Sequence, residues 1–116
     1  MSQTKPDLPM PLKPAVFFIL LALAEGDLHG LGIADDVENA TSGAIRLGPG
    51  TLYRSLKEMT RDGLVREVPA SAEDEDPRRK FYRITAAGRK ILRAEAGRYE
   101  RVVALARAKD VLPEVR

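Results

Sequence analysis

Hydrophobic residues recur at helical spacing over two stretches near the start of the chain. From Leu12 to Ala24 the apolar side chains stand about one turn apart, which predicts a mostly buried helix that ends at Glu25-Gly26-Asp27. Residues 30–41 repeat this pattern more weakly, and Ser42-Gly43 follows them. The stripe expected to face the core in this second helix consists of Leu31, Ala34, Val37 and Ala40.

A third helix is predicted over Thr51–Asp62, with Leu52, Leu56 and Met59 on its buried side and Gly63 after its end. The preceding Gly48-Pro49-Gly50 predicts a turn that is not itself helical, so Thr51 or the glycine turn would cap the helix. Ile45-Arg46-Leu47, before that turn, is a candidate short strand.

The other side of this third helix is cationic. At 100° per residue, Arg54, Lys57 and Arg61 fall within about 80° of one another, with Tyr53 on the flank. Glu58 lies in the same sector and weakens its positive charge. One face of the helix is therefore predicted to be core and another to be a cationic surface.

Two runs of β-favouring residues follow, Leu64–Val68 and Phe81–Ile84, and together they predict a hairpin. Its long loop, Pro69–Pro77, contains Glu73-Asp74-Glu75-Asp76 and is followed at once by Arg78-Arg79-Lys80. The tip of the hairpin is therefore acidic, and the start of its second strand is preceded by basic residues.

A last helix is predicted from Thr85, as its cap, to about Lys109. Its apolar stripe spans more than four turns, and one small domain has little surface left to cover it. A second copy of the helix would do so; packing on the chain's own first helix and a groove for a partner protein are the alternatives. The stripe consists of Ile91, Leu92, Tyr99, Val102, Val103 and Ala106.

Composition supports one globular domain and excludes several classes of function. The chain has 116 residues, 44% of them hydrophobic, and its longest apolar run, Ala15 to Ala24, is too short for a membrane span. Residues 1–77 hold 7 Lys and Arg against 13 Asp and Glu, a net charge of −6, whereas residues 78–116 hold 12 against 4, a net charge of +8. A basic half of this kind fits an anionic partner such as nucleic acid, or simply a solvated, arginine-rich helix. We expect a cytoplasmic protein, which the lack of cysteine permits.

The sequence contains no pattern that predicts an enzyme active site, a metal site or a cofactor site. Cysteine is absent and His29 is the sole histidine, so neither thiolate catalysis nor a histidine metal site is expected, and His29 is interpreted as structural. Asp35 and Asp36 are adjacent on a helix and point about 100° apart, so they do not form a carboxylate pair. The glycine motifs match no dinucleotide or phosphate-binding fingerprint.

Three helices and a hairpin, in this order, predict a mainly α (α+β) winged helix-turn-helix with a long C-terminal dimerisation helix. The expected organisation is an arm at residues 1–10, a DNA-binding domain at 11–85, the dimerisation helix at 86–110 and a tail at 111–116.

Four motifs in residues 28–88 resemble the PadR family of bacterial transcriptional regulators, in particular its smaller subfamily. They are Leu28-His29-Gly30, Gly50-Thr51-Leu52-Tyr53, Gly63-Leu64-Val65, and the run from Arg79-Lys80-Phe81-Tyr82 to Ile84-Thr85-Ala86-Ala87-Gly88. The chain departs from the family pattern at Leu31, Arg54 and Thr60, where the family commonly has tyrosine, proline and an acidic residue.

The resemblance implies a homodimer, joined through the C-terminal helix, that binds a pseudo-palindromic operator in double-stranded DNA. Members usually repress, and a small molecule releases many of them from DNA, so a small-molecule effector is a candidate partner. The recognition helix would be Thr51–Arg61 and the wing Val65–Ile84. Expected DNA contacts are Thr51, Tyr53, Arg54, Lys57, Arg61, Arg78, Arg79 and Lys80. The alternative is a winged-helix module that binds protein or RNA, which the acidic N-terminal part and wing tip would favour.

Overall fold

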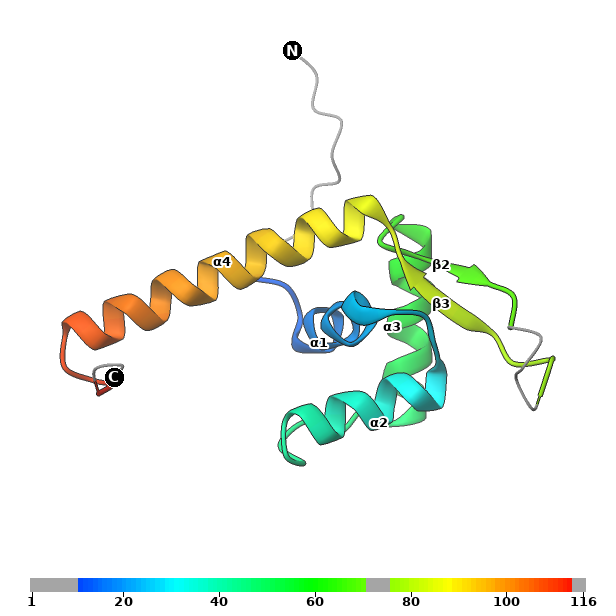
Figure 1. Cartoon of the computed structure of the whole chain (residues 1–116), viewed down its shortest axis with the longest axis horizontal. Coiled ribbons are helices and arrows are strands. Elements are labelled where there is room, and N and C mark those ends of the chain that lie inside the picture. Colours follow the sequence, from blue (N-terminus) through cyan, green and yellow to red (C-terminus); the bar gives the residue numbers. More distant parts are fainter. Residues whose placement is uncertain (1–10, 71–75, 114–116) are drawn as a thin grey trace, which may run out of the picture.

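The computed structural model describes residues 11–70 and 76–113, in which four α-helices pack together and a small sheet lies at one edge of them, with its hairpin projecting outward (Figure 1). The predicted arm, most of the acidic wing tip and the last three residues lie outside these ranges. The fold is the predicted winged helix-turn-helix. Its elements are α1 (Pro14–Ala22), a 3-10 turn η1 (Leu23–Glu25), β1 (Leu28–His29), α2 (Gly30–Ala40), α3 (Pro49–Arg61), β2 (Val65–Val68), β3 (Phe81–Ile84) and α4 (Ala86–Ala108).

The hydrophobic core lies where α1, α2 and α3 meet under the start of α4. Ile19, Leu20 and Ile33 are fully buried, and the predicted α3 stripe of Leu52, Leu56 and Met59 is confirmed. Because apolar residues line most of α1, this helix is buried on several sides and covered by its neighbours.

The predicted stripe of α2 is wrong by part of a turn. Leu31 is 60% exposed and Ala40 is exposed, whereas Ile33, which the prediction omitted, is fully buried with Val37. Ile33 and Val37 are one turn apart, and the core takes this larger pair of side chains together with the partly buried Ala34. Asp35 and Asp36 face solvent, as expected.

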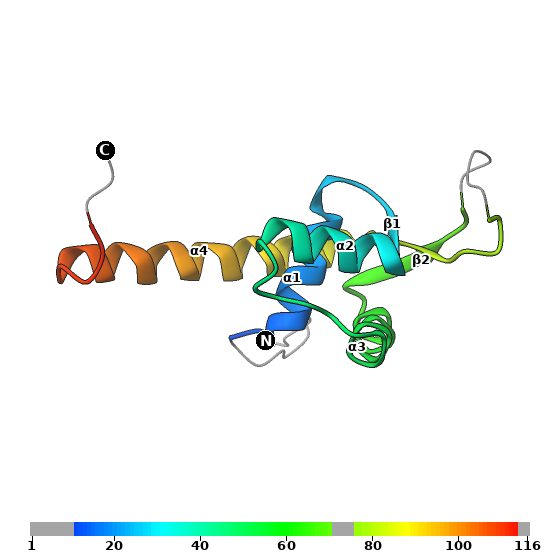
Figure 2. The ribbon, with the colours of Figure 1, turned by 90° about the horizontal axis from the view of Figure 1, so that it is seen from below.

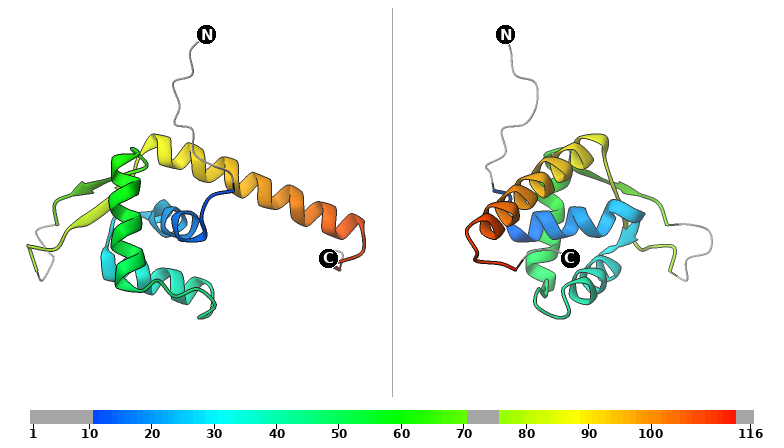
Figure 3. Two further views of the ribbon diagram at one scale, coloured as in Figure 1. Left: turned by 180° about the vertical axis from the view of Figure 1, so that it is seen from behind. Right: turned by 60° about the vertical axis from the view of Figure 1, so that its left-hand side comes forward.

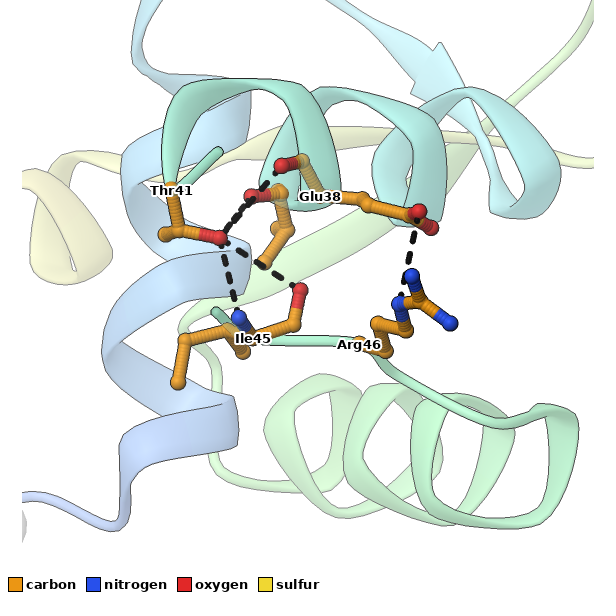
Figure 4. A network of polar contacts seen from close by, with 5 residues as sticks. Glu38, Thr41, Ile45 and Arg46 are labelled. Carbon is orange, nitrogen blue, oxygen red and sulfur yellow. Dashed lines mark hydrogen bonds and ion pairs between the residues drawn. The ribbon is translucent and has the colours of Figure 1, made fainter. Parts of the chain in front are cut away.

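The strand predicted at Ile45–Leu47 does not form. Instead, the Thr41 hydroxyl donates to the carbonyl of Val37 at 2.9 Å and accepts the amide N–H of Ile45 at 3.0 Å (Figure 4). An ion pair between Arg46 and Glu38, at 3.5 Å, ties the same segment back to α2. The local bonds occupy groups that a strand would need for a ladder, and among the described residues this segment pairs with no strand of the sheet.

The turn predicted at residues 48–50 is also wrong in part, because α3 begins at Pro49. Gly48 is the N-cap and has no side chain to offer, and Thr51 lies inside the first turn rather than at the cap. Proline fits the first turn of a helix, where the missing N–H has no partner in any case.

The sheet has three antiparallel strands in the order β1-β3-β2, of which the sequence predicted two. The hairpin pairs Val65 with Ile84 and Val68 with Phe81. The third strand, β1, spans Leu28 and His29 and pairs with Tyr82 and Phe81. Arg83 of β3 donates two hydrogen bonds to the carboxylate of Asp27, the residue before β1, at 3.0 and 2.8 Å, and so holds β1 in place.

The helix α4 starts on the body of the protein and leaves it. The Thr85 hydroxyl accepts from the Gly88 amide at 3.0 Å, so the predicted cap is confirmed. Gly88 lies directly against the backbone carbonyl of Leu64, where a Cβ atom would not fit. The second half of α4 extends away from the other elements on the side opposite the wing (Figures 1 and 2).

Candidate nucleic-acid interface

The helix α3 lies at the outer surface of the domain, beside the hairpin (Figure 3, left; Figure 2). Its apolar side packs inward, which turns Arg54, Lys57 and Arg61 outward, and all three are exposed. Within the described residues Arg54 and Lys57 make no ion pair, while Arg61 approaches Asp62 at 3.5 Å. The charges predicted for this face are therefore brought together on one accessible helix.

Tyr53 and Thr51 occupy the start of α3 in different ways. Thr51 is exposed. Tyr53 is 51% exposed, and its hydroxyl end rests against Gly30, at a point where a side chain on residue 30 would clash. Tyr53 therefore joins the first turns of α2 and α3 while keeping half of its surface open.

The basic residues at the base of the wing are bound to acids of the same chain. Arg78 donates from both its backbone N–H and its Nε to one oxygen of Asp76, at 3.0 and 3.2 Å. These hydrogen bonds lower the pKa of the Asp76 carboxyl. Lys80 lies 4.0 Å from Glu67 on β2, and the backbone N–H of Arg79 donates to the Asp76 carbonyl. The side chains of Arg78 and Lys80 are nonetheless 90% and 70% exposed.

A surface pocket of about 380 Å³ joins these two regions. Tyr53 of α3, Arg79 and Lys80 of the wing, and His29 at the start of α2 all line it. The prediction treated His29 as purely structural, and its ring does pack on Phe81 with the centroids 5.3 Å apart. Its place beside two cations follows from the β1–β3 pairing, which no local sequence pattern indicated.

The six residues proposed for the dimer interface divide into two groups. Leu92 is 7% exposed and belongs to the chain's own core, against which Ile91 packs. Tyr99 and Val102 are 37% and 50% exposed, and Val103 and Ala106 are half-buried. Tyr99 packs edge-on against Phe17 of α1, with the ring centroids 5.0 Å apart, whereas the other three residues of the second group lie on the part of α4 that leaves the domain.

A buried carboxylate marks the boundary between these groups, and the sequence analysis did not identify it. Glu95 is completely buried, and it accepts from the backbone N–H of Leu12 at 2.8 Å and from Arg98 at 2.8 and 3.2 Å. The hydrogen bonds from Arg98 hold the pKa of the Glu95 carboxyl below its ordinary value, although burial alone would raise it. The carboxylate therefore ties the segment before α1 to α4.

The described residues offer neither a metal-ligand cluster nor a membrane-spanning helix. Within residues 11–70 and 76–113 no three histidine, cysteine or acidic side chains gather where they would ligate a metal ion. Among the helices of these ranges, none combines the length and the apolar character that a membrane crossing needs.

Fold and surface together define a winged helix-turn-helix domain with an exposed cationic third helix, which is an arrangement used to enter the DNA major groove. A family model described as the transcriptional regulator PadR-like family matches residues 19–94. The chain belongs to this family, whose members are transcriptional regulators rather than enzymes.

Solved structures of the family share the fold. A PadR family transcription regulator from Clostridium difficile superposes with a TM-score of 0.71 over 83% of this chain and 97% of that one, at 22% identity. Bacillus subtilis PadR, solved in complex with operator DNA, gives 0.61 over 71% of this chain and 46% of that one, at 21% identity.

A curated relative is much longer than this chain. It is an uncharacterised 37.1 kDa protein of transposon TN4556 from Streptomyces fradiae, 37% identical over 87 residues. The match covers 75% of this chain and 23% of the relative, so the chain spans about a quarter of that protein.

Proposed function

We propose that this protein is a sequence-specific DNA-binding repressor that acts as a homodimer in the cytoplasm. The observation that carries the proposal is the outer face of α3, where Arg54 and Lys57 are exposed and have no acidic partner among the described residues. A cationic helix that projects beside a hairpin matches the shape and charge of the major groove. The family of transcriptional regulators supports the same function.

In this proposal the helix and the wing have different tasks. Both Arg54 and Lys57 neutralise phosphates, and Arg54 can instead bind the O6 and N7 atoms of guanine. Thr51 and Tyr53 offer hydroxyl groups to phosphate oxygens near the start of α3. Arg78, Arg79 and Lys80 contact the backbone from the wing, and Arg61 extends the cationic face toward the end of α3.

Support for the homodimer comes from the second half of α4, where Val102 and Leu105 are exposed and nothing among the described residues covers them. Two copies joined there would present two α3 helices to an operator with two-fold symmetry, with half-sites about 34 Å or a multiple of it apart. Release by a small molecule bound between the subunits is part of the proposal and rests on the family alone.

The test is fluorescence anisotropy with DNA from upstream of the protein's own gene, against a scrambled duplex, over a series of salt concentrations. We expect tighter binding to the upstream duplex and a steep loss of affinity with salt. Arg54→Ala and Lys57→Ala should each weaken binding, and a lost phosphate contact should reduce the salt slope by about one unit.

Arg101→Ala is the matched control, because it removes one positive charge from an exposed position of α4 outside the proposed contacts. Equal effects of all three substitutions would show only a general electrostatic attraction. Weak, salt-insensitive binding to both duplexes would refute the proposal and favour a winged-helix module that binds protein.

A further inference from the structure

A row of charged residues follows one side of α4. Arg93, Glu100 and Arg107 are seven residues apart, so they lie above one another at intervals of about 10 Å. All three line one shallow open groove, together with small and apolar side chains that include Ala96, Val103 and Ala104. The charged row therefore borders an apolar strip.

Glu100 has no cation within reach on its own helix. One turn before and after it stand Ala96, Gly97, Val103 and Ala104. In the described parts of the chain neither Glu100 nor Arg93 makes an ion pair. Arg107 donates from Nε to the carbonyl of Pro113 at 3.1 Å, and its terminal amino groups have no partner in the same ranges.

The apolar strip beside the row has the spacing of a coiled-coil seam and is uncovered at one end. Along this strip Leu92 is buried in the chain's own core, Ala96 and Tyr99 are exposed, and Val103 and Ala106 are half-buried. The part of the strip that is open in the described structure is therefore its C-terminal part, which borders the shallow groove. The seam positions alternate at intervals of four and three residues: Leu92, Ala96, Tyr99, Val103 and Ala106.

Charge decides how a second copy can lie on this strip. In an antiparallel pair with two-fold symmetry, the charged row of one helix faces the same row of its partner. A register centred on Glu100 places that carboxylate against its own copy and Arg93 against Arg107, so it is repulsive. A register centred between Ala96 and Gly97 joins Arg93 to Glu100, and one centred between Val103 and Ala104 joins Glu100 to Arg107.

Burial favours the last of these registers. The first half of α4 is already covered by its own chain, since Leu92 and Glu95 are buried there. We propose that α4 pairs antiparallel with α4 of a second copy, centred between Val103 and Ala104, and that two symmetric Glu100–Arg107 ion pairs set this register. The inference rests on the homodimer of the proposed function and adds to it the residues that decide how the subunits align.

Charge reversal tests the pairing with the full-length protein, by sedimentation equilibrium and native mass spectrometry without DNA. Glu100→Arg and Arg107→Glu each replace two attractive pairs by two repulsive ones, so each should raise the dimer Kd about tenfold. An equimolar mixture of the two variants should form the heterodimer in preference to either homodimer. The double variant Glu100→Arg/Arg107→Glu should regain nearly wild-type affinity.

Arg101→Glu is the control, because it reverses one exposed charge on the side of α4 that faces away from the strip. Unchanged dimerisation of both single variants, or failure of the mixture to form heterodimers, would overturn the register. An effect of Arg93→Glu in place of Arg107→Glu would overturn it in favour of the register centred between Ala96 and Gly97. A wild-type chain that stays monomeric would overturn the homodimer itself, whereas a wild-type dimer that binds its operator would leave the proposed function intact.

Discussion

The two halves of α4 share one helical pattern but lie in opposite environments. In the first half Gly88, Leu92 and Glu95 are buried against the same chain. In the second half Val102 and Leu105 are 50% and 57% exposed, and nothing in the described structure covers them. The comparison shows that one continuous helix serves the domain at its start and leaves a surface for another molecule at its end.

Substitution of the two α4 glycines should show this contrast most strongly. Gly88→Ala places a methyl group against the Leu64 carbonyl, so we expect the free energy of unfolding to fall by about 3 kcal/mol. At Gly97 the nearest atom to an added methyl is the end of the Arg101 side chain, 3.7 Å away. Gly97→Ala should therefore stabilise the protein by about 0.5–1 kcal/mol through helix propensity. Urea unfolding followed by circular dichroism, at one protein concentration, measures both, and equal effects would contradict the comparison.

The two leucines test the same boundary. Leu92→Ala leaves a cavity in the core and should cost about 2.5 kcal/mol of unfolding free energy. Leu105→Ala should change the stability of dilute protein by less than about 0.5 kcal/mol, because the side chain is already exposed. A large loss from the second substitution would mean that the second half of α4 is covered within a single chain.

The two carboxylates give a smaller contrast. Glu95→Gln removes the charge that Arg98 pairs with and weakens the acceptor for the Leu12 amide, so a loss of about 2 kcal/mol is expected. The figure lies below the range for fully buried pairs because the Arg98 side chain is 34% exposed. Glu100→Gln should leave the unfolding of dilute protein unchanged, and thermal or urea unfolding compares the two.

Acid should remove the contribution of Glu95. Since its pKa is lower in the folded protein than in the unfolded chain, the carboxylate stabilises the fold above the ordinary value of 4.5 and loses this effect as the pH falls through the folded pKa. The stability difference between wild type and Glu95→Gln should therefore shrink in acid. A difference that stays constant between pH 7 and pH 3 would show that the charge of Glu95 is not what stabilises the junction.

Local patterns in the sequence predicted most of the fold. The stripe of Leu52, Leu56 and Met59 identified the buried face of α3, and its complement identified the cationic face. Thr85 was predicted as the cap of α4, which the structure confirms. These features depend on neighbours within one or two turns, so periodicity and capping chemistry suffice to predict them.

The predictions that were wrong or missing concern residues whose burial or pairing depends on contacts with segments far away in the sequence. Ile33 rather than Leu31 faces the core because of where α2 packs, and β1 exists only because β3 lies beside it. Two residues are too few to show the alternating pattern that predicts a strand. The ion pair between Arg78 and Asp76 was not predicted either, although the acidic wing tip directly precedes the basic residues in the sequence.

Sequence patterns alone identified which segments are helical, which face of α3 is apolar and which is cationic, and the family that the chain resembles. The packing of remote segments was needed to establish that Glu95 is buried and bonded to Leu12, that His29 and Lys80 line one pocket, and that in the described residues α4 packs on its own chain only as far as Tyr99. The physical reason is that helical periodicity is a property of neighbouring residues, whereas burial depends on which remote segments happen to cover them.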